Sequence, residues 1–464
     1  MISKEYIVKP KQAEALKKIN KIIGRSLPSL DERGIPAFGV KIEDKNVVSL
    51  WLERCELEKF PEPILKLDTL KELYLNYNQL TALPDSLDTL SSLVKLNLRW
   101  NFLNKLPDTF GNLSLLEELE LDTNKLAILP ESFGNLSSLH ILILRNNQFE
   151  TLPESFSNLK SIKELYLSKN KFTTFPEPIC NLKSIEGLYF DNNNLSSLPS
   201  TIGNLNSLQI LSLAGNNLKT LPEEILKPLF NLKSLQVLDF SHNQLKTLPE
   251  SIGNLTNLKV LRLRENQLKN LPDSFGKLES LKSLDISKNK FMELPKPILK
   301  LINLERLYAE NNELSSLPES FGNLTSLQQL YLEGNQIMIL PKSFGDLNML
   351  QQIFLVNNQL TTLPVSIGNL KSLRILDLRN NQLTWLPNSI GNLTSLEELD
   401  LRYNEFITIP TIIRKLKNLR QFFLKLEGNP FNIQSARMIS KDVKSIREFL
   451  KSKDKLKDLT KKAK

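Results

Sequence analysis

Few side chains in this sequence could perform catalysis, since it contains only two histidines and two cysteines. His242 follows Ser241 and lies close to Asp239, which supplies the residue types of a serine–histidine–aspartate triad. Neighbouring residues of one strand cannot align a nucleophile, a base and an orienting carboxylate, so we interpret this trio as a solvated strand end. No phosphate-binding loop, kinase motif set or Gly-x-Ser-x-Gly elbow occurs. The sequence therefore predicts a non-enzymatic protein without a cofactor.

The composition indicates a chain that buries a core but has little capacity for metal or disulfide chemistry. Its 464 residues are 41% hydrophobic, and this length usually corresponds to roughly two to four domains. Two cysteines are too few for a disulfide scaffold or a multi-cysteine zinc module. The start, MISKEYIVKPKQ, has no apolar signal-peptide segment, and no apolar run of about 18 residues occurs. We therefore expect a soluble, cytoplasmic protein without a transmembrane segment.

The net charge of +9 is concentrated at the two ends of the chain. Residues 1–46 contain 10 basic and 6 acidic side chains, and residues 411–464 contain 16 basic and 5 acidic ones. The remaining residues hold 34 basic and 40 acidic side chains, so the body is mildly acidic. A nucleic-acid-binding protein normally carries a basic stripe on its binding face, and the body offers none.

The elements that position these side chains follow from a repeat with a period of 23 residues. Cys55 occupies the slot that asparagines fill in the later units, and four extra residues precede Asn243 and two precede Asn429. The pattern predicts 17 units. The asparagines are Asn78, Asn101, Asn124, Asn147, Asn170, Asn193, Asn216, Asn243, Asn266, Asn289, Asn312, Asn335, Asn358, Asn381, Asn404 and Asn429.

Each unit follows the pattern L-x-x-L-x-L-x-x-N-x-L-x-x-L-P-x-x-h-G-N-L-x-x, where h is Ile or Phe. The L-x-L part alternates with period two and predicts a short strand whose leucines point inward. We expect the asparagine amide to bond the turn and the next coil, the proline to stiffen the return arm, and the glycine to permit a turn. Stacked units would bury their leucines together in a solenoid.

The repeat also separates the residues that could bind metal or form a disulfide. His140 and His242 lie four units apart, roughly 19 Å along a sheet, so they cannot share a metal ion. Cys55 and Cys180 lie five units apart, beyond the roughly 7 Å that a disulfide can bridge. We interpret both cysteines as buried spacers.

These residues and motifs resemble the leucine-rich repeat superfamily, over about residues 47–432. The 23-residue period with L-P-x-x-h-G-N-L is similar to its Ras-group branch, which includes plant intracellular Ras-group proteins, the Ras–Raf scaffold and Roco repeat domains. The resemblance implies an α/β repeat fold: a right-handed solenoid, or horseshoe, of about 17 units with a parallel β-sheet on its concave face. It also implies a protein-binding function in signalling, with a small GTPase or its complex as the partner.

The ends of the chain are expected to cap the array. In domain 1–46, residues 10–24 place Leu16, Ile19 and Ile23 on one helical face, and residues 38–42 form a strand that turns into the first repeat. The repeat array occupies 47–432. In domain 433–464, an amphipathic helix with Ile439, Val443, Ile446 and Leu450 on one face covers the last coil. We expect the lysine-rich residues 451–464 to fray.

Aromatic side chains gather at the outward positions of the strands. Seven of the eight tyrosines and two of the three tryptophans lie at the third, fifth, seventh and eighth positions of the units. Tyr, Trp and Arg contribute most binding energy at protein interfaces. The candidate partner-binding residues on the concave face are Trp51, Tyr74, Tyr77, Arg99, Trp100, Glu118, Glu120, Asp122, Arg145, Tyr166, Tyr189, Arg262, Arg264, Arg306, Tyr308, Tyr331 and Phe354.

The fifth position shows the sharpest pattern, because neighbouring units lie one strand apart. It predicts a contiguous ladder of Tyr308, Tyr331 and Phe354. A second aromatic patch near the N-terminus combines Trp51, Tyr74, Tyr77 and Trp100. An acidic cluster, flanked by Arg99 and Arg145, separates the two patches and consists of Glu118, Glu120 and Asp122.

Two interpretations of these aromatic residues stay open. They can bind a partner, or they can stabilise the sheet, since aromatic pairs on adjacent strands contribute about 0.2–1 kcal/mol each. The outward positions hold 15 acidic and 11 basic residues, and such mixed charges between aromatic rings suit a folded protein surface. We expect an interaction scaffold, with a recognition module for peptide or glycan as the alternative.

The basic tail has two interpretations as well. Lysines between Lys451 and Lys464 could contact anionic lipid weakly or touch an acidic partner. Two interspersed aspartates favour a solvated tail that keeps the chain soluble.

Overall fold

The computed structural model describes residues 8–29, 38–420, 423–438 and 441–462, without the side chains of residues 225–226 and 453–462. The chain divides into two compact units, Met1–Leu238 and Asp239–Lys464. The division falls inside strand β10 (Val237–Asp239). The predicted boundaries between caps and repeats, at residues 46 and 432, stay predictions.

The first unit begins with an antiparallel hairpin and continues as a parallel sheet. Strands β1 (Phe38–Glu43) and β2 (Asn46–Leu52) join through Asp44 and Lys45, whose φ angles of 47° and 61° make the predicted tight turn. Each later strand pairs with the next in a 23-residue register, as the repeat predicts. These strands are β3 (Glu72–Tyr74), β4 (Lys95–Asn97), β5 (Glu118–Glu120), β6 (Ile141–Ile143), β7 (Glu164–Tyr166), β8 (Gly187–Tyr189) and β9 (Ile210–Ser212).

The second unit repeats the same parallel arrangement. Its last pairing aligns Leu399 with Leu424, which absorbs the two extra residues that the sequence places before Asn429. The strands are β11 (Val260–Arg262), β12 (Ser283–Asp285), β13 (Arg306–Tyr308), β14 (Gln329–Tyr331), β15 (Gln352–Phe354), β16 (Ile375–Asp377), β17 (Glu398–Asp400) and β18 (Leu424–Lys425).

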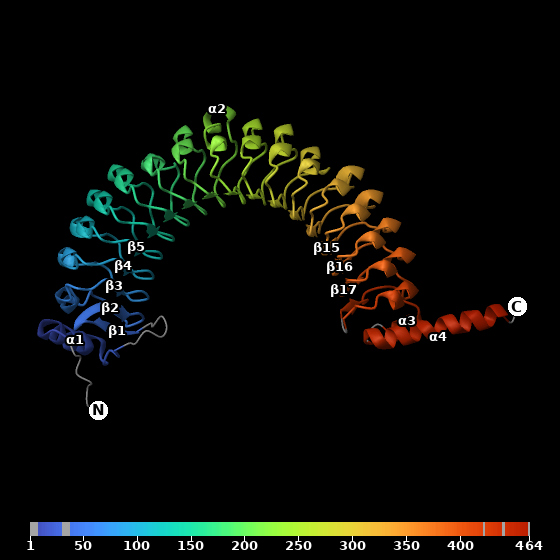
Figure 1. Cartoon of the computed structure of the whole chain (residues 1–464), viewed down its shortest axis with the longest axis horizontal. Coiled ribbons are helices and arrows are strands. Elements are labelled where there is room, and N and C mark those ends of the chain that lie inside the picture. Colours follow the sequence, from blue (N-terminus) through green and yellow to red (C-terminus); the bar gives the residue numbers. More distant parts are fainter. Residues whose placement is uncertain (1–7, 30–37, 421–422, 439–440, 463–464) are drawn as a thin grey trace. The chain divides into compact units, whose positions relative to one another are not determined.

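Within each unit, 3-10 helices form the side of the coils opposite the strands (Figure 1). In the first unit they span Glu62–Lys66, Asp85–Thr89, Asp108–Asn112, Glu131–Asn135, Glu154–Asn158, Glu177–Asn181, Ser200–Asn204 and Leu229–Asn231. In the second they span Glu250–Asn254, Asp273–Lys277, Lys296–Lys300, Glu319–Asn323, Lys342–Asp346, Val365–Asn369, Asn388–Asn392 and Thr411–Lys415. The four extra residues before Asn243 lengthen one return into the short helix α2 (Glu223–Leu226).

The repeat proline directly precedes most of these 3-10 helices. Pro84 and Pro107, for example, stand before Asp85–Thr89 and Asp108–Asn112 with φ near −70°. Proline is suited to a helix start, because its ring holds φ near −65° and it has no N–H group to leave unpaired.

The asparagine ladder links each coil to the preceding one, not to the next as we predicted. Asn101 donates from Nδ2 to the carbonyl oxygens of Leu98 and Leu75, both at 3.0 Å, and its Oδ1 accepts from the N–H of Leu80 at 3.0 Å. Leu75 and Leu80 belong to the coil before. The amide thus satisfies buried backbone groups of its own coil and of the coil before.

The repeat glycines serve close packing between coils, which corrects the turn role that we predicted. A Cβ atom on Gly111 would lie 1.9 Å from the carbonyl oxygen of Ser132 in the next coil, and on Gly134 it would lie 2.1 Å from that of Ser155. Neither glycine has a positive φ. The slot therefore requires glycine where the next 3-10 helix approaches its backbone.

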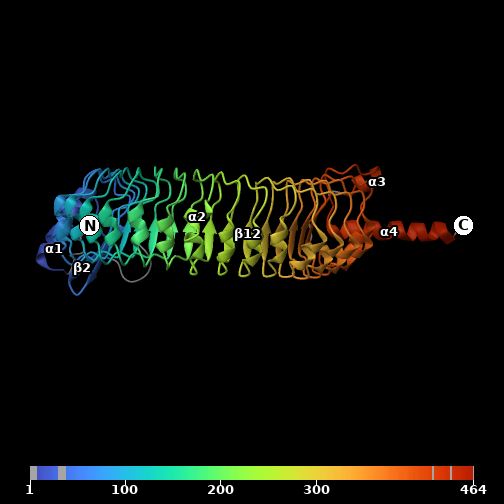
Figure 2. The same ribbon diagram turned by 90° about the horizontal axis from the view of Figure 1, so that it is seen from above.

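The core of each unit is a column of leucines with a spine of phenylalanines. The inward leucines of the strands, such as Leu119 and Leu330, are fully buried. Phe110, Phe133 and Phe156 stack with centroids 6.0 and 6.2 Å apart beneath the 3-10 helices. Successive coils lie side by side within each unit (Figure 2), so every coil buries its leucines against its neighbours.

The N-terminal cap agrees closely with its prediction. Helix α1 (Pro10–Ile23) buries Leu16 and Ile19, leaves Ile23 half-buried and ends at Gly24, whose φ is 69°. Gln12 adds a contact that the pattern did not reveal: its buried side chain accepts a hydrogen bond from the N–H of Val47 at 2.8 Å. The helix is thereby fixed to the start of the first repeat strand.

The C-terminal cap consists of α3 (Ile433–Ala436) and α4 (Val443–Lys462). Val443, Ile446 and Leu450 are buried as expected, whereas Ile439 lies outside the described residues. Helix α4 packs against the 3-10 helix Thr411–Lys415 and so covers the last coil. The backbone continues as a helix to Lys462, which differs from the frayed tail that we predicted from residue 451 onward.

Candidate functional site

The N-terminal aromatic patch, Trp51, Tyr74, Tyr77 and Trp100, forms two ring stacks. Trp51 lies on Tyr74 and Tyr77 lies on Trp100, each with ring centroids 5.5 Å apart. Trp51 is only 8% exposed, because its strand is flanked by β1 and β3, whereas Trp100 is 49% exposed at the turn after β4. Trp100 can therefore contact a partner directly, whereas Trp51 mainly packs against the ring of Tyr74.

Basic side chains cover the tyrosines of this patch. The guanidinium groups of Arg54 and Arg99 lie 4.8 and 5.1 Å from the ring centroid of Tyr77. Arg99 also donates a hydrogen bond of 2.7 Å from Nη2 to the Tyr77 hydroxyl. The ammonium of Lys95 lies 5.8 Å from the Tyr74 ring. These contacts combine aromatic and cationic surface, which the sequence analysis placed only near one another.

The acidic cluster of Glu118, Glu120 and Asp122 lies on β5 and directly after it. Glu118 forms an ion pair with Lys95 at 2.7 Å. Burial raises the pKa of Glu120, and the nearby Lys95 opposes the rise. Burial also raises the pKa of Asp122, and Arg99 and Arg145 oppose it. The cluster is thus partly balanced by cations of the same face.

Tyr166 and Tyr189 form the third stack of the first unit, with centroids 4.4 Å apart. The guanidinium of Arg145 lies 4.2 Å from the Tyr166 centroid and 5.8 Å from that of Tyr189. Glu164 lies beside them, and burial raises its pKa. Gly187 leaves room for the Glu164 side chain, since a Cβ atom on Gly187 would lie 2.2 Å from Oε2 of Glu164.

The aromatic ladder of the second unit consists of Tyr308, Tyr331 and Phe354, on β13, β14 and β15. Ring centroids are 4.6 Å apart between the tyrosines and 4.8 Å between Tyr331 and Phe354, with nearly parallel planes. All three rings are half-buried. Arg306 is exposed at the edge and approaches Glu305 only at 3.9 Å. The predicted contiguous ladder is therefore present as continuous stacking.

Glu310 and Glu333 lie two residues after the two ladder tyrosines and share their face of the sheet. Burial raises the pKa of each carboxyl group to about 7. Repulsion from Glu333 and Asp285 adds to the rise at Glu310, and repulsion from Asp377 adds to it at Glu333. The Oε2 atoms of both residues are buried without a hydrogen-bond partner.

The predicted basic residues Arg262 and Arg264 do not join the ladder. Arg262 approaches Asp239 at 3.5 Å, and Arg264 donates a hydrogen bond of 2.8 Å to the Ser287 hydroxyl. Strand β12 separates β11, which carries Arg262, from β13, which carries Tyr308. Both arginines thus form local contacts on a neighbouring part of the face.

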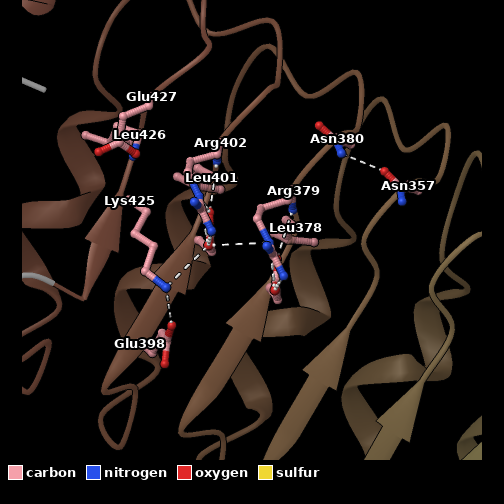
Figure 3. A network of polar contacts seen from close by, with 12 residues as sticks. Asn357, Leu378, Arg379, Asn380, Glu398, Leu401, Arg402, Lys425, Leu426 and Glu427 are labelled. Carbon is pink, nitrogen blue, oxygen red and sulfur yellow. Dashed lines mark hydrogen bonds and ion pairs between the residues drawn. The ribbon is translucent and has the colours of Figure 1, made fainter.

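The last strands of the second unit carry an ionic network around two buried aspartates (Figure 3). Arg379 and Arg402 each grip the aspartate two residues earlier, Asp377 and Asp400, with Nη2–Oδ2 distances of 2.6 Å. Arg379 Nε also reaches Asp400 at 3.5 Å, and Lys425 reaches it at 3.6 Å. The Asp400 side chain is only 2% exposed. These charges neutralise one another within the sheet.

The residue types of a catalytic triad do not assemble. Nδ1 of His242 lies 2.8 Å from Oε2 of Glu265 on the next coil, while Asp239 accepts a hydrogen bond from the backbone N–H of Ser241 at 2.8 Å. Across residues 8–29, 38–420, 423–438 and 441–452, no group of three His, Cys, Asp or Glu side chains could hold a metal ion.

The two cysteines have different surroundings, so one of the predicted buried spacers is wrong. Cys180 is buried, and burial raises the pKa of its thiol to about 11. Cys55 is half-buried, and Arg25 donates to its Sγ at 3.4 Å. Cys55 occupies the asparagine position of the first coil. No repeat precedes this coil, so there are no backbone groups of an earlier repeat for an asparagine to bond.

Among the described helices, none is long and apolar enough to cross a membrane. The lysine side chains of residues 453–464 lie outside the described part of the chain, so the predicted contact of the tail with anionic lipid stays a prediction.

Comparison with known proteins connects this architecture to a family. The family description "Leucine-rich repeat region" matches residues 228–334 and 329–462. "Leucine rich repeat" matches residues 68–126 and 126–172, and a further repeat description matches residues 207–229. The chain belongs to the leucine-rich repeat family. No curated protein matches this sequence.

Solved structures with the same fold include bacterial and plant leucine-rich repeat proteins. A leucine-rich repeat protein of Leptospira interrogans is 35% identical, with a TM-score of 0.74 over 86% of this chain and 93% of its own. The ectodomain of the plant membrane receptor kinase GASSHO1/SCHENGEN3 from Arabidopsis thaliana is 29% identical, with a TM-score of 0.63 over 85% of this chain and 50% of its own. A plant peptide hormone receptor is 27% identical, with a TM-score of 0.55 over 82% of this chain and 74% of its own.

Three carboxylates of this leucine-rich repeat protein, Glu164, Glu310 and Glu333, were not among the predicted site residues. All three occupy outward positions, the third in one unit and the seventh in two others, so their place on the face was visible in the repeat. The candidate site was predicted from the aromatic residues at the fifth position, and the charges of neighbouring acidic and basic residues were not compared. That comparison along the seventh position would have singled out Glu310 and Glu333, since they are adjacent carboxylates in a column.

Proposed function

We propose that this leucine-rich repeat protein is a non-enzymatic scaffold that binds a folded protein partner on the outward face of its repeat sheets. The observation that supports it most is the series of aromatic stacks on that face, above all the Tyr308–Tyr331–Phe354 ladder. Tyrosine, tryptophan and arginine contribute most energy at protein interfaces, and the stacks combine all three.

The stacks also stabilise the sheet, and the two roles leave different traces. Cross-strand aromatic pairs add about 0.2–1 kcal/mol each, whether or not a partner is present. A purely stabilising role does not require solvent access, yet the ladder rings are half-buried and Trp100 is 49% exposed. Exposed aromatic surface among mixed charges favours a surface that meets another protein.

A peptide ligand is the second candidate, and the similar structures favour it. The GASSHO1/SCHENGEN3 ectodomain was solved in complex with Casparian strip integrity factor 2, and the plant peptide hormone receptor was solved in complex with RGF2. Such a ligand would lie along the same outward positions. The glycan form of this alternative has no comparable support.

A small GTPase or its signalling complex is the finer form of the first proposal. Its support is the 23-residue L-P-x-x-h-G-N-L motif, which is similar to the Ras-group repeats. This partner would place the protein in the cytoplasm, which cell fractionation with an antibody against the chain can test.

The test is an affinity capture that compares the wild-type chain with a Tyr308→Ala, Tyr331→Ala, Phe354→Ala triple variant. We expect a partner that the wild type retains and the triple variant loses, with circular dichroism confirming that both are folded. A Tyr166→Ala, Tyr189→Ala variant of the first unit is the matched control, because it removes an equal type of stack elsewhere.

Captures with GTP, GDP and no nucleotide separate the partner classes. A partner retained only with GTP supports the GTPase proposal, and a partner indifferent to nucleotide supports another protein. If the wild type and both variants retain the same proteins, these stacks are structural, and the exposed Trp100 becomes the next surface to test.

A further inference from the structure

The aromatic stacks of the first unit all carry a cation from the same chain. Arg54 and Arg99 lie over Tyr77, Lys95 lies over Tyr74, and Arg145 lies over Tyr166 and Tyr189, at distances of 4.2 to 5.8 Å. Positive groups over aromatic faces are attracted by the ring quadrupole. Each of the three stacks in the first unit thus has a lysine or arginine side chain over one of its rings.

The ladder of the second unit lacks such a cation. Over the described residues, no Lys or Arg forms a cation–π contact with Tyr308, Tyr331 or Phe354. Arg145 stands in the seventh position, one strand before Tyr166; the corresponding residue one strand before Tyr308 is Ser287. Ser287 is fully buried and too short to reach over a ring.

Two carboxylates lie next to the ladder instead of a cation. Glu310 and Glu333 lie side by side next to the ladder, and no ion pair is found for either within the described part of the chain. The basic residues nearest along their column are engaged elsewhere, since Arg264 bonds Ser287 and Arg379 grips Asp377. The buried Oε2 atoms of both glutamates have no hydrogen-bond donor.

We propose that the ladder and the Glu310–Glu333 pair together receive an arginine side chain of the partner protein. This inference rests on the proposed protein-binding function and names what the partner presents. The guanidinium would supply a cation for the rings and, because both glutamates are half-buried, N–H donors for the part of each carboxylate that solvent still reaches. The occupant is argued from charge complementarity between a negative aromatic surface and a positive side chain.

An arginine fits this site better than other cations. The guanidinium group is flat, stacks on aromatic rings and presents parallel N–H donors that match carboxylates. A lysine ammonium is a compact charge that cannot stack in this way. The positions around the ladder add an apolar neighbour, Val356, and two amides, Gln329 and Gln352, which suit a peptide segment around the arginine.

Binding at this site should strengthen as the pH rises. Burial raises the pKa of Glu310 and Glu333 to about 7, so a share of the pair is protonated near neutral pH. The charged groups that act on them are Glu333, Asp285 and Arg264 at Glu310, and Asp377 and Arg379 at Glu333. A bound guanidinium favours the ionised forms, so it must displace protons at pH 6 but few at pH 8.

A peptide-display library tests the inference without knowledge of the partner. Random peptides are selected on the full-length wild-type chain and on a Glu310→Gln, Glu333→Gln variant, whose side chains keep their size. We expect the wild type to enrich peptides with arginine next to apolar residues, and the variant to lose this enrichment. A Glu118→Gln variant of the first unit is the matched control, because Glu118 already forms an ion pair with Lys95 at 2.7 Å.

Affinity measurements on one selected peptide give the quantitative result. We expect the dissociation constant to rise at least about tenfold when citrulline replaces the arginine, when both glutamates are replaced, and when the pH falls from 8 to 6. Val356→Arg should weaken binding as well, because it places a guanidinium beside Glu333, as Arg99 lies beside Asp122. The tyrosine–phenylalanine ladder stays intact in this variant.

The results separate this inference from the proposed function. Selected peptides that depend on the ladder but contain no basic residue, or that bind the glutamine variant equally well, overturn the arginine site and leave the scaffold function standing. Failure to enrich any arginine peptide on the wild type overturns it too. If the Tyr308→Ala, Tyr331→Ala, Phe354→Ala variant still captures the protein partner, the proposed binding function at this surface is wrong.

Discussion

At the scale of single residues, the neighbouring coil decides how each outward carboxylate behaves. Glu398 on β17 forms an ion pair with Lys425 of the following strand at 2.8 Å. Glu310 faces Glu333 instead, and burial removes water from both; among the described residues neither forms an ion pair, although Arg264 and Arg379 partly oppose the rise in their pKa values. Glutamates at outward positions of the same repeat therefore differ: one forms an ion pair, whereas the other two are partly buried and form no ion pair among the described residues.

This difference predicts a pH-dependent gain of stability from Glu310→Gln, Glu333→Gln. The pKa of each carboxyl group is raised from 4.5 to about 7, so the native state holds these protons better than the unfolded state. The associated stability is complete below pH 4.5 and is lost as the pH rises through 7. Neutral glutamine avoids that loss. A pKa unit corresponds to about 1.36 kcal/mol, and after allowance for partial solvation we expect about 1 kcal/mol per residue at pH 8.

Urea unfolding at pH 5 and pH 8 measures this effect. The variant and the wild type should agree at pH 5, and the variant should be more stable at pH 8. The exposed Glu313→Gln serves as control and should show no such difference. A constant offset at both pH values would mean that packing, not ionisation, distinguishes the variant.

At the scale of elements, the 3-10 helices set how closely the coils approach. Glycine fills the slot in Asp108–Asn112 and Glu131–Asn135, where the next coil brings a serine carbonyl oxygen within about 2 Å of an added Cβ. Ser157 fills the same slot in Glu154–Asn158, and there the next coil has Pro178 in place of the serine. The glycine requirement thus belongs to a pair of neighbouring coils, not to one turn.

Gly134→Ala should destabilise the first unit by about 1–3 kcal/mol, because the backbone of two coils must separate to admit the methyl group. The lower backbone entropy of alanine recovers only about 0.5–1 kcal/mol. Urea unfolding is the measurement. Ser157→Ala, in the equivalent slot, should change stability by less than about 0.5 kcal/mol. Equal effects of the two substitutions would show that the slot is not closely packed.

At the scale of the whole molecule, stability is a sum over neighbouring coils in two compact units. Each coil takes its hydrogen bonds from adjacent coils, as the bonds of Asn101 to Leu75 and Leu80 show. A substitution that destabilises one coil should therefore destabilise mainly the coils adjacent to it.

Asn101→Ala tests this locality. It leaves the buried N–H of Leu80 without a partner, whereas the carbonyl oxygens of Leu75 and Leu98 keep hydrogen bonds from Asn78 and Asn124. We expect a cost of about 1–3 kcal/mol. Hydrogen exchange should accelerate in the coils around residues 75–124 and stay unchanged in the second unit. The exposed Asn135→Ala is the control and should leave exchange unaltered. Acceleration of equal size in both units would show that the chain unfolds as one cooperative body.

The repeat pattern predicted most of the fold because its period is carried by chemistry local to each unit. Alternating leucines specify a strand, a leucine–proline pair specifies the return, and the 23-residue spacing specifies which residues align. The candidate ladder followed from that alignment alone. Errors arose where two coils meet: the backward reach of the asparagine, the reason for glycine and the exposure of Cys55.

The coil, the strand register and the set of side chains on the outward face follow from periods of two and 23 residues, which the sequence contains. Which of those side chains are free to bind depends on how the folded coils pack against one another. Trp51 is covered whereas Trp100 is open, Arg145 lies over Tyr166, and Glu310 and Glu333 each have a buried Oε2 atom without a hydrogen-bond partner. The physical reason is that exposure and charge balance arise between neighbouring coils, and a one-dimensional pattern does not contain side-chain directions.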